Sequence, residues 1–315
     1  SYRGLVGFGQ CDITPDVGIH FRLWGSSRHE VATSVHRPLF VTAMSLRRAP
    51  DARPIVIAAI DFCWFSSYET ANMVRRPIIA THGLADDEFL LVLTHSHAVP
   101  QCDVELESKP GGEKVAAFRA KLINAMCRAV TAAIDSEAPS IITWGRGVAP
   151  LACTRDFVDP ASGRILCGPN PSGIADNTLV VGRVVNEQTR RQTGTVVNYA
   201  CHPVSLGGGN TSISPDYVGS LREVVEANTG GAPCLFLHGP SGNQTPRDSY
   251  SDQLQVADAN GEILAFSSLA TLRSLLPPGE RLEFAGIEES GATLARWRAR
   301  SVAVDTTLKS DVRYV

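Results

Sequence analysis

Short apolar segments with the composition of buried strands alternate along this chain with segments that have helical periodicity. Pro54–Phe62 and Phe89–Thr94 are strand-like runs, whereas Glu113–Asp135 places its apolar residues on one face of a helix. Further strand-like segments are Ser140–Trp144, Thr178–Asn186, Thr193–Ala200 and Pro233–His238. The second and third of these are separated by a short polar turn and predict a hairpin. Alternation of this kind predicts an α/β or α+β fold, with layered mixed β-sheets flanked by helices.

Capping residues and helix breakers predict where the helices begin and end. The serines at 66–67 are N-cap candidates for a helix that Gly83 closes. The Ser-Pro-Asp sequence at 214–216 predicts another helix start, with a capping residue, a proline in the first turn and an acid near the positive helix end. Glu262–Leu276 predicts a last helix, which Pro277 ends.

Composition and charge exclude several classes of protein. Apolar residues make up 43% of the 315 residues and charged residues 19%, which fits a globular protein with a sizeable core. The net charge is −3 and Lys and Arg do not cluster, so no nucleic acid or anionic membrane is expected as a partner. No apolar run is long enough to cross a bilayer. We therefore expect a soluble protein without an integral membrane segment, either cytoplasmic or exported after loss of a signal peptide.

The eight cysteines are spaced singly, without a C-x-x-C pair. This spacing argues against a structural zinc ribbon or a redox dithiol. Buried free thiols are the favoured interpretation, and disulfides are the alternative.

Two histidines follow directly after the strand-like run that ends at Thr94. His95 and His97 are two positions apart, and in an extended chain side chains at that spacing lie on the same face. Histidine is the commonest zinc donor, and a catalytic zinc has about three protein ligands and one open position. The pair is therefore interpreted as part of a metal site, with an ordinary hydrogen-bonded pair at a strand end as the alternative.

A third histidine, His202, closes the strand-like segment that ends at Ala200. Pro203 favours an extended conformation at residue 202 and ends the strand there. His202 should therefore lie at the rim of a sheet, where the sites of α/β proteins gather. The alternative is a partly exposed histidine that binds nothing.

The turn Gly239–Asn243 follows another strand-like segment and contains Ser241. A turn of this kind can present backbone N–H groups and a hydroxyl to a substrate oxygen. Asn243 stands where a G-x-S-x-G nucleophile elbow has its second glycine. A metal-free serine hydrolase that uses Ser241 is therefore the less favoured alternative.

Five segments in this order resemble motifs of the neutral/alkaline ceramidase family. The first resembles the opening G-x-x-x-x-D-I-T-P, and the segments that contain His95 and His202 resemble T-H-T-H-x-x-P and N-Y-A-C-H-P. The last two resemble an S-x-D-x-x-G helix start and a G-x-x-G-D-x-x-P loop. The five segments are Gly7–Pro15, Thr94–Pro100, Asn198–Pro203, Ser214–Gly219 and Gly239–Arg247. The resemblance spans roughly residues 4–250 and implies a ceramidase-like catalytic domain.

The resemblance implies a zinc-dependent hydrolase that cleaves an N-acyl amide bond, in a small molecule or a lipid, by metal-activated water. Carried over residue by residue, it makes His95 and His202 the zinc ligands. It makes His97 a catalytic residue that assists proton transfer or orients the water, and Thr245 the second catalytic candidate. The candidate substrate-binding residues are Arg155, Gly239 and Asn243.

Three departures from the family matter. Thr245 replaces a serine and Asn243 replaces an aspartate of the same loop. The family's remaining zinc ligands, a glutamate and a tyrosine, have no recognisable motif here, and Glu280 is expected to be a loop residue rather than a ligand. The departures leave room for an alternative function, a member of the family that binds metal or ligand without catalysis.

Residues 1–276 are predicted to form the ceramidase-like metallohydrolase domain, and 277–315 to begin a further, incomplete part of it. Two histidines are too few for a catalytic zinc. We therefore expect the other donors to lie beyond Val315 or on a further chain, unless a divergent glutamate such as Glu262 or Glu288 replaces them. Tyr314 is too isolated for an assignment.

The segments next to the candidate site carry few apolar side chains. Gln101–Gly112 is short and charged, and Asp156–Asp176 is rich in Pro, Gly, Ser and Asp. A ceramide would need an apolar groove, since each buried CH₂ group contributes about 0.8 kcal/mol. The predicted substrate is therefore an amide smaller or more polar than ceramide, with a long-chain lipid amide as the alternative.

Overall fold

One eight-stranded sheet organises the protein. The structure, a computed structural model, describes residues 1–311. In order across the sheet, the strands are β12 (Cys234–His238), β10 (Gln192–Tyr199), β9 (Thr178–Asn186), β6 (Ala138–Val148), β1 (Tyr2–Asp12), β3 (Phe40–Arg47), β4 (Ile55–Ile60) and β5 (Phe89–Leu93). The pairs β4–β5 and β10–β12 are parallel, and the other neighbours are antiparallel.

Helices and smaller sheets complete the described part of the chain. The α-helices are α1 (Tyr68–His82), α2 (Val115–Asp135), α3 (Tyr217–Asn228) and α4 (Leu254–Ser274). The short 3-10 helices are η1 (Asp86–Glu88), η2 (Val104–Ser108) and η3 (Gly112–Lys114). The smaller sheets pair β2 (Ser34–Val35) with β11 (Ser212–Ile213), β7 (Ala152–Val158) with β8 (Ile165–Asn170) and β13 (Gln244–Pro246), and β14 (Glu280–Glu289) with β15 (Thr293–Ser301).

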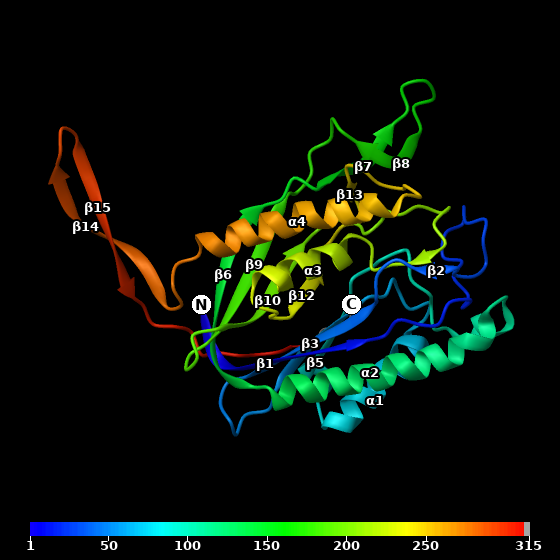
Figure 1. The fold of residues 1–315 in the computed structure, drawn as a ribbon, viewed down its shortest axis with the longest axis horizontal. Helices are drawn as coiled ribbons and strands as arrows, with labels where there is room; N and C mark the ends of the chain where they lie inside the picture. Colours follow the sequence, from blue (N-terminus) through cyan, green and yellow to red (C-terminus); the bar gives the residue numbers. More distant parts are fainter. Residues whose placement is uncertain (312–315) are drawn as a thin grey trace.

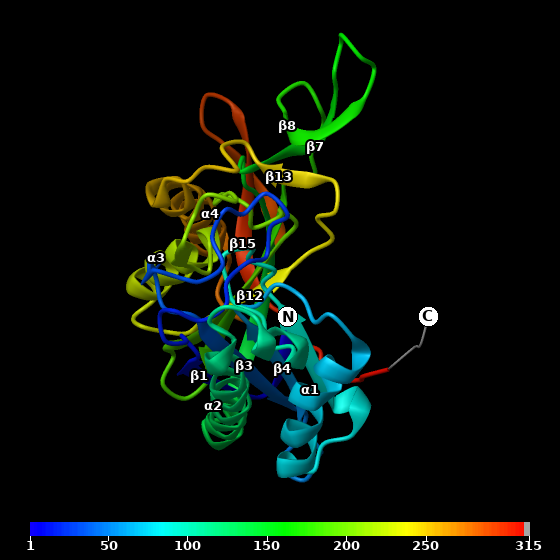
Figure 2. The same cartoon turned by 90° about the vertical axis from the view of Figure 1, so that its right-hand side faces the viewer.

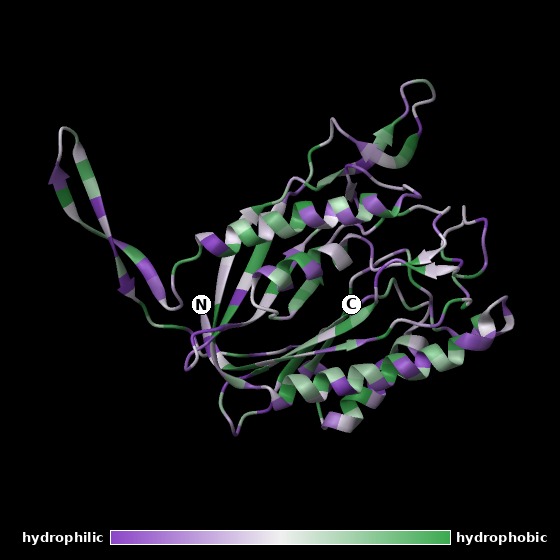
Figure 3. Ribbon diagram, viewed as in Figure 1, coloured by the Kyte–Doolittle hydropathy of each residue, from purple (hydrophilic) through white to green (hydrophobic). Residues whose placement is uncertain are grey.

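The large sheet is folded onto itself, so that its two halves face each other across a shared apolar core. This core takes Val6 and Met44 from one half and Val184, Val196 and Leu235 from the other. On the outer faces, α1 and α2 cover β1, β3, β4 and β5, whereas α3 and α4 cover the other four strands (Figures 1 and 2). The strands of the large sheet are rich in apolar residues, as the hydropathy colours of Figure 3 show. The predicted class, layered mixed sheets flanked by helices, is confirmed.

The strands that the sequence predicts best are short, mostly apolar segments. β4, β5, β9, β10 and β12 lie within one or two residues of their predicted bounds, and β9 and β10 form the predicted antiparallel hairpin. β1 and β3 are absent from the prediction, and β6 extends to Val148 instead of ending at Trp144. In β1, Gly4, Gly7 and Gly9 interrupt the apolar pattern that marks a strand.

The ends of α1 and the start of α3 test the predicted capping residues. Ser67 is the N-cap of α1, where its hydroxyl accepts a hydrogen bond from the Thr70 N–H, and Gly83 closes the helix with a left-handed φ of 61°. The predicted start of α3 at Ser214 is wrong, because the N-cap is Asp216. The Ser214 hydroxyl instead accepts the N–H of Asp216 and stabilises the turn before the helix.

The start of α4 differs more from the prediction. This helix begins at Leu254, eight residues before the predicted start at Glu262. Its first turns pack against α3 through the buried residues Asn260 and Gly261, and a Cβ atom at Gly261 would lie 2.4 Å from the Tyr217 carbonyl oxygen. The contact with α3 is therefore made by an amide and a glycine, which interrupt the apolar spacing of a predicted helix.

Residues 277–311 form the β14–β15 hairpin and a segment that returns to β1. The hairpin projects from the body of the protein at the end opposite to β7, β8 and β13 (Figure 1). Glu280 begins β14, and Glu288 forms an ion pair with Arg296 inside the hairpin. The return segment pairs with β1 at Asp305. Tyr314 lies outside the described residues, and the domain boundary at residue 276 stays a prediction.

None of the helices that the structure describes has the length and apolar character that a membrane-spanning segment requires. The longest of them, α2 and α4, each have 21 residues, and both carry a face that packs on the sheet.

Helix α2 lies unusually close to β1 because β1 presents glycines to it. A Cβ atom at Gly9 would lie 2.1 Å from the Ala129 carbonyl oxygen, and one at Gly7 would lie 2.0 Å from that of Ala133. Backbone atoms of α2 cannot move aside as a flexible side chain could. The close approach of helix and strand therefore depends on these two glycines.

Gly9→Ala should lower the free energy of unfolding by about 2 kcal/mol, because α2 must move away from β1 to admit the methyl group. Urea denaturation measures this change. The matched control is Gly168→Ala, since a Cβ atom there would meet nothing within 4 Å, and it should change the free energy by less than about 0.5 kcal/mol. Equal effects of the two substitutions would contradict the close approach.

Candidate metal centre

The carboxyl ends of β5, β10 and β12 meet at one place in the folded sheet, and each end carries histidine. His95 and His97 follow β5, His202 follows β10, and His238 ends β12. The segments are tied together by backbone hydrogen bonds, such as the one that the His97 N–H donates to the Pro203 carbonyl oxygen at 3.4 Å. These four residues are called the histidine cluster below.

Three of the four imidazoles converge through the same ring nitrogen. His202 Nε2 lies 3.2 Å from His95 Nε2 and 3.2 Å from His97 Nε2. In a tetrahedral zinc site with Zn–N distances of about 2.0–2.1 Å, ligand nitrogens are about 3.3 Å apart. The spacing in the cluster is close to that value. The ring of His238 stacks on that of His95 with the centroids 5.5 Å apart.

Hydrogen bonds to the other ring nitrogens constrain the tautomers of two cluster residues. His95 Nδ1 lies 2.8 Å from the Cys63 carbonyl oxygen, and His202 Nδ1 lies 3.3 Å from the Ser241 carbonyl oxygen. The Cys63 carbonyl oxygen only accepts, so His95 Nδ1 carries a hydrogen and His95 Nε2 presents its lone pair to His202. His202 Nδ1 lies 3.3 Å from the Ser241 hydroxyl as well as from the carbonyl oxygen; with a hydrogen on this Nδ1, the Nε2 lone pairs of His95 and His202 face each other at 3.2 Å. The donor set therefore fits a metal ion.

Cys63 belongs to an overlapping group of donors. Its Sγ atom and one ring nitrogen each of His95 and His97 all lie within 4.8 Å of one another. Burial raises the pKa of the Cys63 thiol, which is therefore protonated unless a metal displaces the proton. All eight cysteines are free, as the sequence predicts.

Burial keeps the histidine cluster neutral. It lowers the pKa of His97 to about 3, that of His238 to about 3 and that of His202 to about 4, and the neighbouring histidines act in the same direction. The pKa of His95 is lowered for the same reason. Neutral imidazole is the form that binds metal ions.

The H-x-H segment reaches the cluster in a different way from that predicted. His95 has a φ of 71°, in the left-handed region, so the segment is not extended and strand alternation does not align the two side chains. This conformation costs about 1–2 kcal/mol for a residue with a Cβ atom. Hydrogen bonds from the His95 N–H to Phe62 and from the Ser96 hydroxyl to Ser214 stabilise it. The predicted convergence of His95 and His97 is found, but the predicted reason is wrong.

The sequence analysis did not single out His238 or its contact with Ser241. The Ser241 hydroxyl lies 2.7 Å from His238 Nε2 and 3.3 Å from His202 Nδ1, so it connects two cluster residues. The sequence contains the same signal for His238 as for His202, a histidine at the end of a buried strand. Applying that criterion to Pro233–His238 would have found it.

Two tryptophans flank the cluster, and the sequence gives no signal for either of them. The ring of Trp24 lies 4.7 Å from that of His97, and the ring of Trp64 lies 5.5 Å from it. Both come from irregular segments far apart in the chain. They give the cluster apolar walls, which strengthen electrostatic interactions inside it.

The remaining predicted site residues lie on β7, on β13 and in the turn between β12 and β13. Arg155 donates from Nε to the Gly242 carbonyl oxygen and from its backbone N–H to that of Asn243. The N–H of Gly239 is already donated to Tyr199, so it is not free for a substrate. Thr245 is fully buried, and its hydroxyl makes no hydrogen bond among the described residues. Their functional roles stay predictions.

The glutamates weighed as replacement ligands lie away from the cluster. Glu280 and Glu288 are in the projecting hairpin, at the opposite end of the protein from Thr245 and β13 (Figure 1). Glu262 is an exposed residue of α4. Among the described residues, the candidate metal donors at this place are therefore histidines and Cys63, without a carboxylate.

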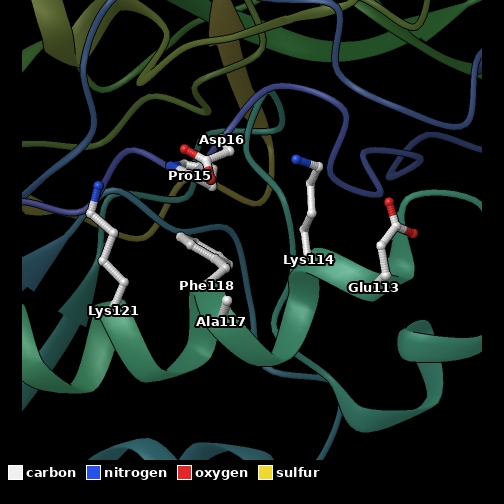
Figure 4. A pocket seen from close by; sticks show the side chains of 7 residues that line it. All are labelled: Pro15, Asp16, Glu113, Lys114, Ala117, Phe118 and Lys121. Carbon is white, nitrogen blue, oxygen red and sulfur yellow. The ribbon is translucent and has the colours of Figure 1, made fainter.

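A separate pocket of about 220 Å³ lies where α2 begins (Figure 4). Its lining combines Asp16 and Glu113 with Lys114 and Lys121, and Phe118 forms part of the floor. None of the four histidines lines it. The two acidic and two basic side chains balance in charge, and the pocket is separate from the histidine cluster.

Two solved structures are similar to this chain over 90% of its length. One is a neutral ceramidase from Pseudomonas aeruginosa, with a TM-score of 0.69 and 16% identity, and the other is a ceramidase complexed with C2, with a TM-score of 0.70 and 18% identity. The chain has the neutral ceramidase fold. It covers 48% and 47% of the two ceramidase chains, about half of their length. No family model matches the sequence, and no curated protein matches it.

The motif resemblance to neutral ceramidases is confirmed at the level of the fold. The similarity includes the sheet and helices that place His95, His97 and His202 together. At 16–18% identity it shows the arrangement of the backbone alone.

His202→Ala should abolish stoichiometric zinc binding, because it removes the nitrogen that lies within 3.2 Å of two others. The loss should exceed the roughly 100-fold upper range for residues that only orient a ligand. Cys63→Ser should keep one equivalent of zinc. Chelator competition measures both affinities, with His82→Ala, outside the cluster, as the control. Full zinc content in both His95→Ala and His202→Ala would refute the centre.

The metal-free protein should lose stability as the pH falls below about 6.5. His97 and His238 have a pKa near 3 when folded and near 6.5 when unfolded, so the unfolded state binds more protons in that window. Each residue should cost about 1.4 kcal/mol per pH unit between pH 6.5 and 3, and nothing above it. Urea unfolding of chelator-treated protein from pH 8 to 5 measures the slope. His97→Gln should flatten it, and an unchanged slope in that variant would contradict the assignment.

Proposed function

We propose that the protein is a metal-dependent hydrolase of amide bonds and that the metal is zinc. The observation that carries the proposal is the convergence of three imidazole Nε2 atoms at a spacing close to that of ligand nitrogens around a tetrahedral zinc ion. The neutral ceramidase fold supports the same chemistry, because the solved structures that share it are ceramidases.

The ligand roles follow from the hydrogen bonds of the Nδ1 atoms. His95 and His202 would bind zinc, because their Nδ1 atoms donate to carbonyl oxygens that orient the rings. Zinc bound there would polarise the scissile carbonyl and make water nucleophilic at neutral pH. The ring of His97 makes no such bond from Nδ1 among the described residues, so its tautomer is not fixed. His97 would therefore accept the proton of the attacking water and return it to the leaving amine.

Thr245 would position the substrate. Its hydroxyl is buried, without a hydrogen bond among the described residues, next to the Tyr250 phenol. A free buried hydroxyl is costly unless a ligand completes its hydrogen bonds. A substrate oxygen at this place would satisfy it, with Asn243 exposed at the mouth of the same turn.

One observation favours a second function, a metal-free serine hydrolase. The Ser241 hydroxyl lies 2.7 Å from His238 Nε2, the geometry of a nucleophile and its general base. Two observations weigh against it. The Nδ1 atom of His238 has no partner among the described residues, so no carboxylate orients the ring, and Ser241 is only 4% exposed. The third function, metal binding without catalysis, shares the ligands of the first.

A chelator should abolish hydrolysis of a short-chain N-acyl amide, and zinc should restore it, whereas a serine-directed phosphonate should have no effect. His202→Ala should lower kcat/KM by about 1,000-fold or more, since polarisation by the metal contributes several kcal/mol. Ser241→Ala, which removes only a hydroxyl that contacts His202, should lower it by less than about 30-fold.

The same measurements separate the three functions. Inhibition by the phosphonate together with resistance to the chelator would establish the Ser241 enzyme instead. Stoichiometric zinc without hydrolysis of short or long amides would establish a binding protein. Comparing a short-chain amide with a long-chain ceramide in detergent also tests substrate size. Ile165 of β8 and Ile174, which follows that strand, are exposed to solvent and form no buried groove. A smaller or more polar amide stays the proposal.

A further inference from the structure

Arg155 carries a positive charge that no carboxylate of the described residues neutralises. None of the ion pairs among these residues involves it. Its Nε donates to the Gly242 carbonyl oxygen at 2.8 Å, in the turn whose Ser241 contacts His202. One of the five N–H groups of the guanidinium is therefore used, and four are free to bind a ligand.

Tyr250 lies beside the histidine cluster in a strained conformation. Its φ of 57° is rare for a bulky residue, and hydrogen bonds from Tyr250 N–H to Val204 and from Ser251 N–H to Ser205 stabilise it. Its ring contacts Trp24, which packs on His97. The phenol oxygen lies 3.4 Å from the Cys167 sulfur, a weak partner, and has the buried Thr245 hydroxyl nearby. A strained residue with an underused hydroxyl beside the cluster suggests a ligand contact.

Contacts connect Arg155 with Tyr250 and with the cluster. Asp156, the next residue of β7, pairs with Cys167 of β8, and the Cys167 sulfur lies 3.4 Å from the Tyr250 phenol oxygen. Arg155 Nε donates to the Gly242 carbonyl oxygen, next to the Ser241 hydroxyl that contacts His202 and His238. A guanidinium without an ion-pair partner among the described residues, placed beside these groups, attracts an anionic group of a ligand.

We propose that Arg155 and Tyr250 form an anion subsite for a carboxylate of the substrate, so that the preferred amides carry a carboxylate close to the scissile bond. This inference rests on the proposed amide hydrolysis. A guanidinium binds a carboxylate through parallel N–H···O bonds, and the phenol donates a further bond. The carboxylate belongs either to the amine, as in an N-acyl amino acid, or to the acid, as in a monoamide of a dicarboxylic acid.

Three amides of similar size test the subsite. They are N-hexanoylglycine, its neutral counterpart N-hexanoylethanolamine, and the mono-N-butylamide of succinic acid. The kcat/KM of one of the two carboxylates should exceed that of the neutral amide at least tenfold, and the better one identifies the side of the carboxylate. Arg155→Met should reduce this ratio to about one, and Tyr250→Phe should reduce it in part. Raising the salt concentration should also reduce it.

The control removes a positive charge from the same region without touching the subsite. Arg247 donates to the Pro150 carbonyl oxygen and is exposed, so Arg247→Met should leave the ratio unchanged. A wild-type ratio of one or less would overturn the subsite. An unchanged ratio in Arg155→Met would overturn it as well.

Direct binding separates the subsite from the proposed hydrolysis. Titration calorimetry with N-hexanoylglycine should show binding to the wild type that is at least tenfold weaker in Arg155→Met, with the protein fold of both checked by circular dichroism. If no amide is hydrolysed but this difference is found, the subsite stands and the proposed function is wrong. If amides are hydrolysed and neither binding nor rate depends on the carboxylate, the proposed function stands and the subsite is wrong.

Discussion

The apolar contact between the two halves of the large sheet is the interaction on which the rest of the structure depends. β10 and β5 are six strand positions apart, which would be about 29 Å in a flat sheet. Packing of Val196 and Leu235 against Met44 and Ala59 folds the sheet and brings β12 against β3, β4 and β5. The imidazoles of His95 and His202 consequently lie 3.2 Å apart.

The sequence predicts the parts of this arrangement better than their relation. Strands such as β4 and β10 are apolar on both faces and stand out, and each candidate histidine was placed correctly at a strand end. The folding of the sheet leaves no local signal, because side chains such as Ile142 look the same whether they face a helix or a second sheet layer. The sequence predicts that His95 and His97 lie together, but it predicts the wrong backbone conformation for His95. It gives no indication of His238 or Trp24, whose neighbours in space come from distant segments.

Backbone strain is concentrated around the cluster. Of the four non-glycine residues with positive φ among residues 1–311, His95 belongs to the cluster, Tyr250 contacts Trp24 beside it, and Asp216 lies in the segment that supports it. The Asp216 carboxylate accepts hydrogen bonds from the N–H groups of Ser205 and Leu206, which follow His202. Each strained residue is therefore stabilised by bonds to the chain around the site. Such conformations persist where the surrounding structure over-determines them, and they gather at functional sites.

The placement of the donors on β5 and β10 gives a bound ion a mechanical role as well as a chemical one. An ion bound by His95 and His202 joins two distant strands of the sheet, as a cross-link would. Its binding free energy adds to the stability of the folded sheet, by about 4 kcal/mol when free metal is at 1,000 times its dissociation constant. When metal is scarce, a smaller fraction of the protein would be folded, and each molecule would also lose activity. The lifetime of the protein would then depend on the supply of metal.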